Sequence, residues 1–541
     1  MITQYLDDMR REFSDYRPSV FVKDLLAGLT VAAVALPLAL AFGVSSGADA
    51  ASGLVTAIFA GLIIGILGGA PYQVSGPTGT MAAILLPLSA TYGIQGVLIT
   101  GFLSGVILLV AALLKAGRLV SIIPSAVITG FTAGIAILIA GGQIDHFFGT
   151  TSSGSTLLQS LASYRTLGFA VQWQPLMFGL LVVFIMVFWP KKWATKLPSS
   201  LIAIIVALVV NLIGSFSVIE VGSIPKALIL EQRFHFSDIS FENLRPFITP
   251  AIGVAAIGMV ESLLAGAAGE KMTHMKMDPD RWLISQALGN LVMPFLGGVP
   301  ATAAIARTSV SVKAGMRTRV TNIVHSVVLI LSMFLLGPLM GRIPLAALAG
   351  VLMITSWRMN DWLSIKRYFK HLYKTSIAQF IVTMAATVIF GLTTAILVGI
   401  GLSMVLFVIR SSNLEIAVSN IDERHEKGKN LSAKLTKVRL VYVTGQLFFG
   451  SIDNLITALE ELQGVSTIIL SIRGVPSIDH SAMLELEQLH SSMQNSQIAL
   501  LFCGLQPQVQ RQFSRAGFDD VVGRHNIFAN AVEAIDSLQN E

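Results

Sequence analysis

Charged residues and cysteine are both scarce in this chain of 541 residues. Asp, Glu, Lys and Arg together make up 13% of it, against about 25% in an average soluble protein. Hydrophobic residues make up 53%, and the mean hydropathy is +0.72. This balance excludes an ordinary soluble domain and indicates a membrane protein. The single cysteine, Cys503, excludes an intrachain disulfide framework and fits a reducing compartment.

Several motifs of enzymes and nucleic-acid-binding proteins are also missing. The sequence has no Gly-x-x-x-x-Gly-Lys-Ser/Thr loop, no His-Glu-x-x-His pair and no Cys/His spacing typical of zinc. We therefore expect neither ATP-driven pumping nor an enzyme, and no cofactor. Although the net charge is +6, no basic stripe with interleaved aromatic residues occurs, so no nucleic-acid partner is expected. Residues 1–24 are polar and of mixed charge, which predicts a cytoplasmic N-terminal segment and not a signal peptide.

Fourteen apolar segments fill residues 25–410 and predict a polytopic α-helical membrane domain that lies in the lipid bilayer. A polar stretch, 220–246, divides them into two sets of seven. The first set comprises residues 25–44, 51–68, 78–88, 94–114, 119–140, 176–188 and 199–219. The second set comprises residues 247–268, 283–296, 301–312, 320–340, 343–355, 377–390 and 392–409.

Lys and Arg are distributed unevenly among the loops that join these segments. If the N-terminus is cytoplasmic, most of them fall in inside loops. The loop after residue 355 is the most basic, with Arg358, Lys366, Arg367, Lys370 and Lys374. The positive-inside rule therefore predicts that both termini lie in the cytoplasm. We expect a multi-pass protein of the inner (plasma) membrane.

The third segment of each set is too short to cross about 30 Å of hydrocarbon. Residues 78–88 follow a Gly-Gly-Ala-Pro sequence and begin within Ser-Gly-Pro-Thr-Gly-Thr, while residues 301–312 follow Gly-Gly-Val-Pro. Short segments interrupted by Gly and Pro at matching positions are typical of transporters built from inverted repeats, whose substrate site lies between them. We therefore predict two inverted repeats of seven segments, residues 25–220 and 247–409.

The two short segments predict an anion site near the middle of the bilayer. Free N–H groups at two helix N-termini carry about half a positive charge each and can replace water around an oxyanion. Only Glu261 and Arg307 carry a full charge away from the end of a segment. We predict that Arg307 binds substrate and that Glu261 holds the coupling ion. The other predicted substrate-binding residues are Pro77, Thr78, Gly79, Thr80, Ala301, Thr302 and Ala303.

Each of these residues has a structural alternative. Arg307 could extend toward water at the cytoplasmic end of a short helix, and Glu261 could serve only as a partner of Arg307 or of a backbone amide. The three threonines, Thr78, Thr80 and Thr302, could pack helices instead of supplying hydroxyl donors. Four further polar residues are more typical of interhelical hydrogen bonds than of substrate binding: Asn211, Gln286, Asn290 and His325.

Beyond Arg410 the composition becomes that of a soluble domain. Residues 411–432 are polar and charged and predict a linker. The patterns that follow predict strands at 438–444, 466–472 and 497–503, and helices at 453–462, 481–493, 507–516 and 527–538. This alternation predicts a small cytoplasmic α/β domain over residues 433–541.

The chain resembles the SulP (sulfate permease) family of anion transporters over nearly its whole length, and its tail resembles the STAS domain of that family. The resemblance rests on residues 24–28, 35–43, 76–79, 261–264, 306–310, 314–315, 317–318 and 478–481. It implies a fourteen-span fold of two inverted repeats like that of uracil permeases, with core and gate domains, elevator-like movement and usually a homodimer. In the STAS domain it implies Ser481 as a regulatory site and a surface for a cytoplasmic regulatory protein.

Residues 35–43 are most similar to the bacterial branch that includes sodium-coupled bicarbonate transporters. Two positions depart from that branch: Glu261 stands in place of its aspartate, and Ala265 lacks the hydroxyl that helps to hold sodium. The expected function is secondary active transport of a small inorganic anion, bicarbonate or sulfate, coupled through Glu261 to H⁺ or Na⁺. The alternatives are a dicarboxylate/H⁺ symporter, an anion exchanger, a passive anion channel, and a membrane signalling protein that acts through its STAS domain.

Overall fold

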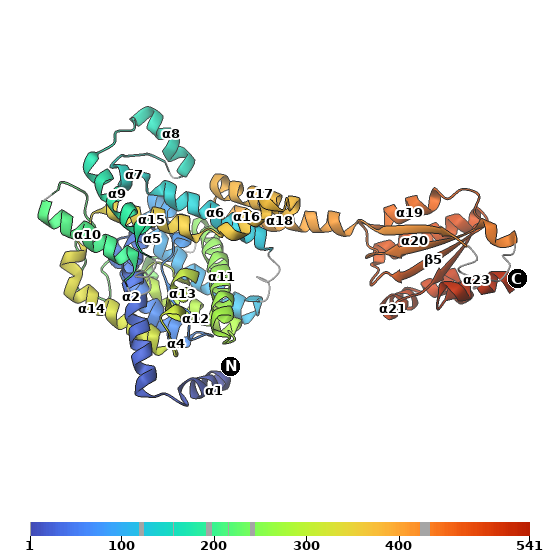
Figure 1. Cartoon of the computed structure of the whole chain (residues 1–541), viewed down its shortest axis with the longest axis horizontal. Coiled ribbons are helices and arrows are strands. Elements are labelled where there is room, and N and C mark those ends of the chain that lie inside the picture. The colour runs from blue at the N-terminus through green and yellow to red at the C-terminus, as the bar shows by residue number, and fades with distance from the viewer. Residues whose placement is uncertain are drawn as a thin grey trace. The chain divides into compact units, whose positions relative to one another are not determined.

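The chain folds into two compact units, Met1–Ile400 and Gly401–Glu541. The computed structural model describes residues 2–117, 124–154, 156–190, 197–214, 216–238, 244–421 and 433–540. The first unit is helical and the second is a mixed α/β domain (Figure 1).

Helices dominate the first unit because an apolar run in lipid leaves its backbone N–H and C=O groups no partners except one another. Among the described residues, six helical stretches are long and apolar enough to cross a membrane. They are α2 (Pro18–Ser45), Ala50–Leu67 (α3, Ala50–Phe59, a π-helical turn and α4, Gly65–Leu67), α5 (Gly79–Leu113), Ser125–Phe148 (α6, Ser125–Gly142, and α7, Ile144–Phe148), α11 (Arg245–Thr273) and α14 (Val320–Met340). Shorter apolar helices are α9 (Trp173–Phe188), α10 (Ser199–Gly214), α15 (Leu345–Met359), α17 (Lys374–Phe390) and Leu397–Ser411 of α18 (Leu392–Ser411). The remaining helices are α1 (Ile2–Phe13), α8 (Leu157–Leu167), α12 (Pro279–Val292), α13 (Ile305–Lys313) and α16 (Trp362–Lys370).

The predicted apolar segments fall on these helices, with several corrections to their bounds. The segments predicted at 78–88 and 94–114 are the two parts of α5, which breaks at Gly93, where φ is 66° and ψ is −168°. Such a positive φ favours glycine. Leu119, the predicted start of the fifth segment, lies outside the described residues, and α6 begins at Ser125. The segment predicted at 199–219 ends as a helix at Gly214.

Two very short strands pair with each other within the first unit, and we call this pair of strands the crossing. β1 (Ser75–Gly76) pairs antiparallel with β2 (Thr302–Ala303), so that Ser75 faces Ala303 and Gly76 faces Thr302. The helix predicted to begin at residue 301 therefore begins only at Ile305, because the intervening backbone is part of the strand pairing. Since α5 begins shortly after β1 and α13 shortly after β2, the crossing brings both helix N-termini to the same place.

Buried ion pairs attach the N-terminal helix α1 to the rest of the first unit. Arg319 is 2% exposed and pairs at 2.8 Å with Glu12, which is 10% exposed. Arg281 pairs at 2.6 Å with Asp8. The ring of Tyr5 lies 5.5 Å from each of these two guanidinium groups. The polar N-terminal segment is therefore a packed part of the helical unit.

A five-stranded sheet organises the second unit, in the order β3-β4-β5-β6-β7. β3 (Glu415–Asn420) is antiparallel to β4 (Val438–Thr444), and β4, β5 (Thr467–Gly474), β6 (Ala499–Cys503) and β7 (Ile527–Phe528) are parallel. Buried residues of α19 (Ile452–Glu460), α20 (His480–Asn495), α21 (Pro507–Ala516) and α22 (Phe518–Val522) pack against one side of the sheet, and those of α23 (Ala531–Asn540) against the other.

Two predictions for this unit are wrong in part. The stretch 411–432, predicted as a linker, contains the edge strand β3, whose six residues are mostly exposed and stand within a polar stretch. Residues 422–432 lie outside the described residues. The helix predicted at 527–538 begins as β7, and α23 starts at Ala531.

Candidate functional site

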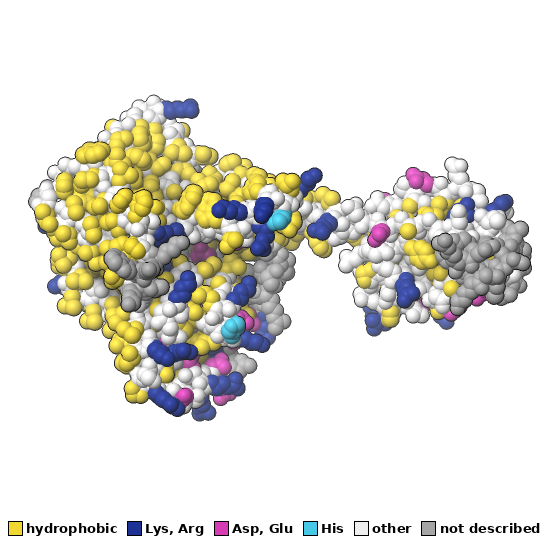
Figure 2. Space-filling model, in the orientation of Figure 1, with side chains coloured by type: hydrophobic (Ala, Val, Ile, Leu, Met, Phe, Trp, Pro, Cys, Tyr) yellow, Lys and Arg dark blue, Asp and Glu magenta, His cyan; other side chains and the backbone are white. Residues whose placement is uncertain are grey.

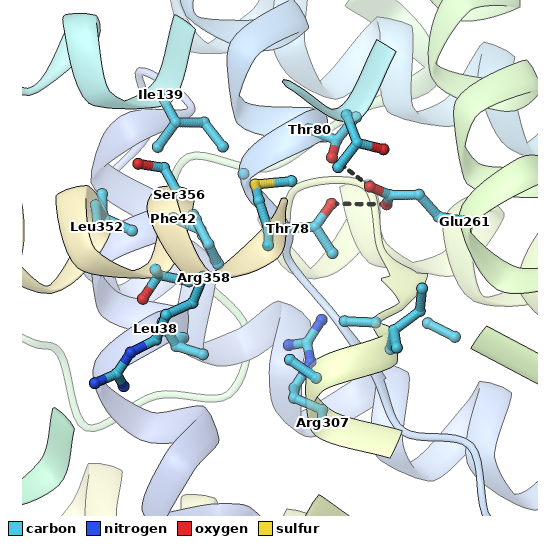
Figure 3. Close-up of a pocket in the computed structure, with 18 of the residues that line it drawn as sticks. Leu38, Phe42, Thr78, Thr80, Ile139, Glu261, Arg307, Leu352, Ser356 and Arg358 are labelled. Atoms are coloured by element: carbon cyan, nitrogen blue, oxygen red, sulfur yellow. Dashed lines mark hydrogen bonds between the residues drawn. The ribbon is translucent and has the colours of Figure 1, made fainter. Parts of the chain in front are cut away.

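A cavity of about 290 Å³ lies beside the crossing of β1 and β2 (Figure 3). One part of its wall comes from the N-termini of α5 and α13 and from α11, and it includes Glu261 and Arg307. The opposite part comes from α2, α6 and α15, where apolar side chains alternate with polar ones. The lining residues are Leu38, Phe42, Thr78, Gly79, Thr80, Thr132, Ile139, Glu261, Leu264, Ala303, Ala304, Ile305, Ala306, Arg307, Leu352, Thr355, Ser356, Arg358 and Met359.

The N-termini of α5 and α13 both open on this cavity. Thr78 is the N-cap of α5, and Ala304 is the N-cap of α13. The first N–H groups of a helix have no partner within the helix, so each terminus offers unpaired donors and a partial positive charge. The two termini therefore create a region of positive potential in a largely apolar surrounding.

The loop before β2 is fixed by an amide side chain of α12. Asn290 Nδ2 donates to the carbonyl oxygen of Ala301 at 3.1 Å, and the backbone N–H of Ala301 donates to Asn290 Oδ1 at 2.7 Å. Gln286 Nε2 also donates to Ala301 O, at 3.4 Å. Asn290 and Gln286 were predicted to make interhelical hydrogen bonds, but their partner is the loop backbone at Ala301, and these bonds hold the crossing in place.

Arg307 projects from the first turn of α13 and is 2% exposed. Its Nη2 lies 3.5 Å from the carbonyl oxygen of Thr302, at the limit of a hydrogen bond, and Nε and Nη1 have no hydrogen-bond partner among the described residues. The guanidinium lies directly against Gly76 of β1. Because its side chain is buried, Arg307 does not extend to water at the end of the helix. A permanently charged group with unused donors beside a cavity is suited to binding an oxyanion.

Glu261 lies on α11 and faces the first turn of α5 (Figure 3). Its carboxylate accepts a hydrogen bond from Thr78 Oγ1 at 3.2 Å and another from Thr80 Oγ1. No ion pair joins Glu261 to Arg307 in the part of the chain that the structure describes. The acid therefore offsets the charge of Arg307 across the cavity and not by direct contact.

Several residues predicted to bind substrate have other contacts. The hydroxyls of Thr78 and Thr80 donate to Glu261, so they are not free to donate to an anion in this state. Thr302 is fully buried, and its Oγ1 donates to Gly258 O at 3.0 Å and lies 2.9 Å from Ser262 Oγ. Pro77, Ala301 and Thr302 do not line the cavity, whereas Thr78, Gly79, Thr80, Ala303, Glu261 and Arg307 do. Pro77, Ala301 and Thr302 lie in or directly beside the paired strands β1 and β2.

The opposite wall contains residues that the sequence analysis did not select as site residues. Thr132 comes from α6, and Thr355, Ser356 and Arg358 come from α15. Arg358 donates to the carbonyl oxygen of Met186 and to Ser199 Oγ, so it is partly engaged with other helices. The sequence predicts that Arg358 lies in an inside loop, because it follows the end of an apolar segment. Its position at the cavity depends on how α15 packs against α2 and α6, for which the sequence carries no pattern.

Three other predicted features lie away from the cavity. Asn211 Nδ2 donates to Glu220 Oε1 and to Arg342 O, which lie in connecting segments and not on the neighbouring helix that the sequence predicted. His325 is fully buried and neither ring nitrogen has a hydrogen-bond partner among the described residues, so the interhelical hydrogen bond predicted for it is wrong. In the second unit, Ser481 is exposed in the first turn of α20, next to the N-cap Asp479. Among the described residues, no three His, Cys, Asp or Glu side chains are placed to share a metal ion.

Comparison with solved structures defines the class of protein. The structure of the murine Solute Carrier 26 family member A9 anion transporter superimposes with a TM-score of 0.85 over 98% of this chain and 93% of that one, at 17% identity. The chain is therefore a helical polytopic membrane protein with the SLC26 fold.

Comparison of sequences then gives the family. The Sulfate permease family matches residues 21–386, and the STAS domain matches residues 432–534. YvdB of Bacillus subtilis is 30% identical over 95% of this chain and 97% of its own length. The Bicarbonate transporter BicA of a Picosynechococcus species is 28% identical over 91% of this chain and 90% of its own length. The chain belongs to the sulfate permease (SulP) family of anion transporters, carries a C-terminal STAS domain, and is not an enzyme.

Proposed function

We propose that this chain is a secondary active transporter that moves sulfate or bicarbonate across the inner (plasma) membrane. The observation that carries the proposal is the antiparallel pairing of β1 with β2, which brings two helix N-termini and Arg307 to one cavity. The family name and the name of BicA supply the two candidate anions. Both are oxyanions, which backbone N–H groups and a guanidinium bind well.

The charges around the cavity support coupling to a proton. Two helix N-termini contribute about half a positive charge each and Arg307 contributes one, so the total is about +2 with Glu261 neutral and about +1 with Glu261 ionised. A proton on Glu261 then favours an anion of higher charge, and its release to the cytoplasm favours release of the anion. Glu261 is placed for this role because it lines the cavity and reaches the N-terminal turn of α5. Na⁺ is the alternative coupling ion.

The cavity lies between two sets of helices, which supports an elevator-like movement. The wall with Glu261 and Arg307 belongs to α11 and to α5 and α13, which both pack on α11, and the opposite wall belongs to α2, α6 and α15. In our proposal the first group forms part of a core domain that carries the anion, and α6 and α15 form part of a gate domain. The complete arrangement comprises fourteen spans in two inverted repeats, both termini in the cytoplasm, and a homodimer.

Uptake into proteoliposomes tests the proposal. The purified full chain is reconstituted, and labelled sulfate and labelled bicarbonate are supplied in turn with an imposed H⁺ or Na⁺ gradient. We expect accumulation of one anion above its external concentration, driven by the H⁺ gradient, and loss of uptake in Arg307→Gln. Arg165→Gln, a change of an exposed arginine outside the cavity, is the control and should transport normally. Equilibration without accumulation under both gradients would indicate a passive channel and would overturn the proposal.

A further inference from the structure

The helix α16 has the character of a helix at a membrane surface. Its apolar residues Trp362 and Ile365 face α6 and α17 across a groove, while Lys366, Arg367 and Lys370 are exposed on another side. Amphipathic helices of this kind lie in the headgroup region of a bilayer. Figure 2 shows Lys and Arg side chains gathered over α16 with hydrophobic surface beside them.

The three cations of α16 have no acidic partner in the part of the chain that the structure describes. No ion pair among the described residues includes Lys366, Arg367 or Lys370. Leu363 lies one turn before Arg367 on the same helix and is 79% exposed. An exposed leucine surrounded by unpaired cations suits a surface that touches both acyl chains and anionic headgroups.

An apolar groove of about 310 Å³ runs beside these cations. Its walls are α6, α15, α16 and α17, with Ala136, Met353 and Met384 along it. At its α16 end lie the rings of Trp357 and Trp362, whose centroids are 4.4 Å apart, and Trp362 Nε1 donates to Trp357 O at 3.0 Å. Tryptophan pairs of this type are typical of the boundary between hydrocarbon and headgroups.

We infer that this groove binds an anionic phospholipid, with one acyl chain along α6 and α17 and the phosphate near Lys366, Arg367 and Lys370. The charge favours a lipid over a second copy of the chain, because a partner protein would have to bury or pair the three exposed cations of α16, which lie outside the lining of the groove. The predicted orientation places α16 on the cytoplasmic side, where membranes carry anionic lipids. Ser356 of α15 lines both the groove and the anion cavity. A lipid seated here therefore contacts the helix that borders the transport site.

Lipid retention by the full chain tests this inference. The detergent-solubilised protein is titrated with phosphatidylglycerol or phosphatidylcholine, and bound lipid is measured by native mass spectrometry. We expect phosphatidylglycerol to bind about 100-fold more tightly, because each of the three cations strengthens binding about 5-fold. The triple variant Lys366→Gln/Arg367→Gln/Lys370→Gln should weaken phosphatidylglycerol binding about 100-fold and leave phosphatidylcholine binding unchanged.

A matched triple variant controls for the loss of charge. Arg165→Gln/Lys226→Gln/Arg245→Gln removes three exposed cations that lie outside α16 and should retain phosphatidylglycerol like the unchanged chain. Equal retention of the two lipids by the unchanged chain would overturn the inference without any variant. Equal losses of phosphatidylglycerol in both triple variants would also overturn the inference. So would a change of oligomeric state without loss of lipid, or displacement of phosphatidylglycerol by soluble glycerol phosphate at equal concentration.

Discussion

Replacing Gly76 by Ala is expected to weaken anion binding by displacing Arg307. A Cβ built on Gly76 would lie 2.4 Å from Arg307 Nη1 and 3.1 Å from Cζ, whereas ordinary van der Waals contact begins at 3.4 Å. Gly76 has no positive φ, so the backbone of β1 accepts a side chain and keeps its pairing with Thr302. The guanidinium therefore has to move by about 1 Å to restore contact distance.

The size of the effect follows from this displacement. A movement of about 1 Å stretches a charge-assisted hydrogen bond of about 2.9 Å to about 3.9 Å, which breaks it. A hydrogen bond to a charged group contributes about 1.5–3 kcal/mol. Since every 1.4 kcal/mol changes Kd tenfold, we expect the Kd of the transported anion to rise about 10- to 150-fold.

Isothermal titration calorimetry on the solubilised full chain measures this change within a double-mutant cycle. In an Arg307→Gln background, Gly76→Ala should have little further effect, because the group that it displaces is absent. Gly142→Ala is the matched control, since nothing lies within 4 Å of its added Cβ. An unchanged Kd, or an equal loss in the presence and absence of Arg307, would refute the reasoning.

Three further predictions concern charge and burial. Glu261→Gln removes the negative charge of the cavity, so anion uptake by proteoliposomes should lose its dependence on pH; a pH profile like that of the unchanged chain would contradict the coupling role. Glu12→Gln leaves the buried Arg319 uncompensated, at a cost of about 3–5 kcal/mol, and should lower the midpoint of thermal unfolding. Asp15→Asn, in an exposed pair, should leave the midpoint unchanged. Burial raises the pKa of the Cys503 thiol, so less thiolate is present at neutral pH, and maleimide should label the native chain slowly and the urea-unfolded chain quickly. Rapid labelling of the native chain would show that Cys503 is accessible.

The positions of the helices could be predicted from the sequence because lipid imposes a simple physical rule. An apolar run in hydrocarbon must satisfy its own backbone, so hydropathy alone predicts where helices lie. The two Gly/Pro-interrupted segments likewise indicated that two short helices begin inside the membrane domain, although the second begins only at Ile305, after β2. The edge strand β3 was missed because it is short and mostly exposed and stands within a polar, charged stretch, so it lacks the run of buried apolar residues that marks the inner strands.

The contacts of the candidate site depended on the tertiary structure. Composition and position alone singled out Glu261 and Arg307, because an ionised group in lipid is costly and stands out against an apolar background. The sequence could not show that Thr78 and Thr80 donate to Glu261, or that Arg307 lies against Gly76 with two nitrogens unpaired.

The sequence by itself thus determined which segments are apolar helices, which two residues within them carry charge, and where an α/β domain follows. Only the tertiary structure decided that β1 and β2 pair in one register, so that two helix N-termini separated by more than two hundred residues share a cavity. The physical reason is that hydropathy is a local property of each segment. The acceptor of each threonine hydroxyl and the helices that form the opposite wall of the cavity depend on how distant segments pack together. No local sequence pattern predicts that packing.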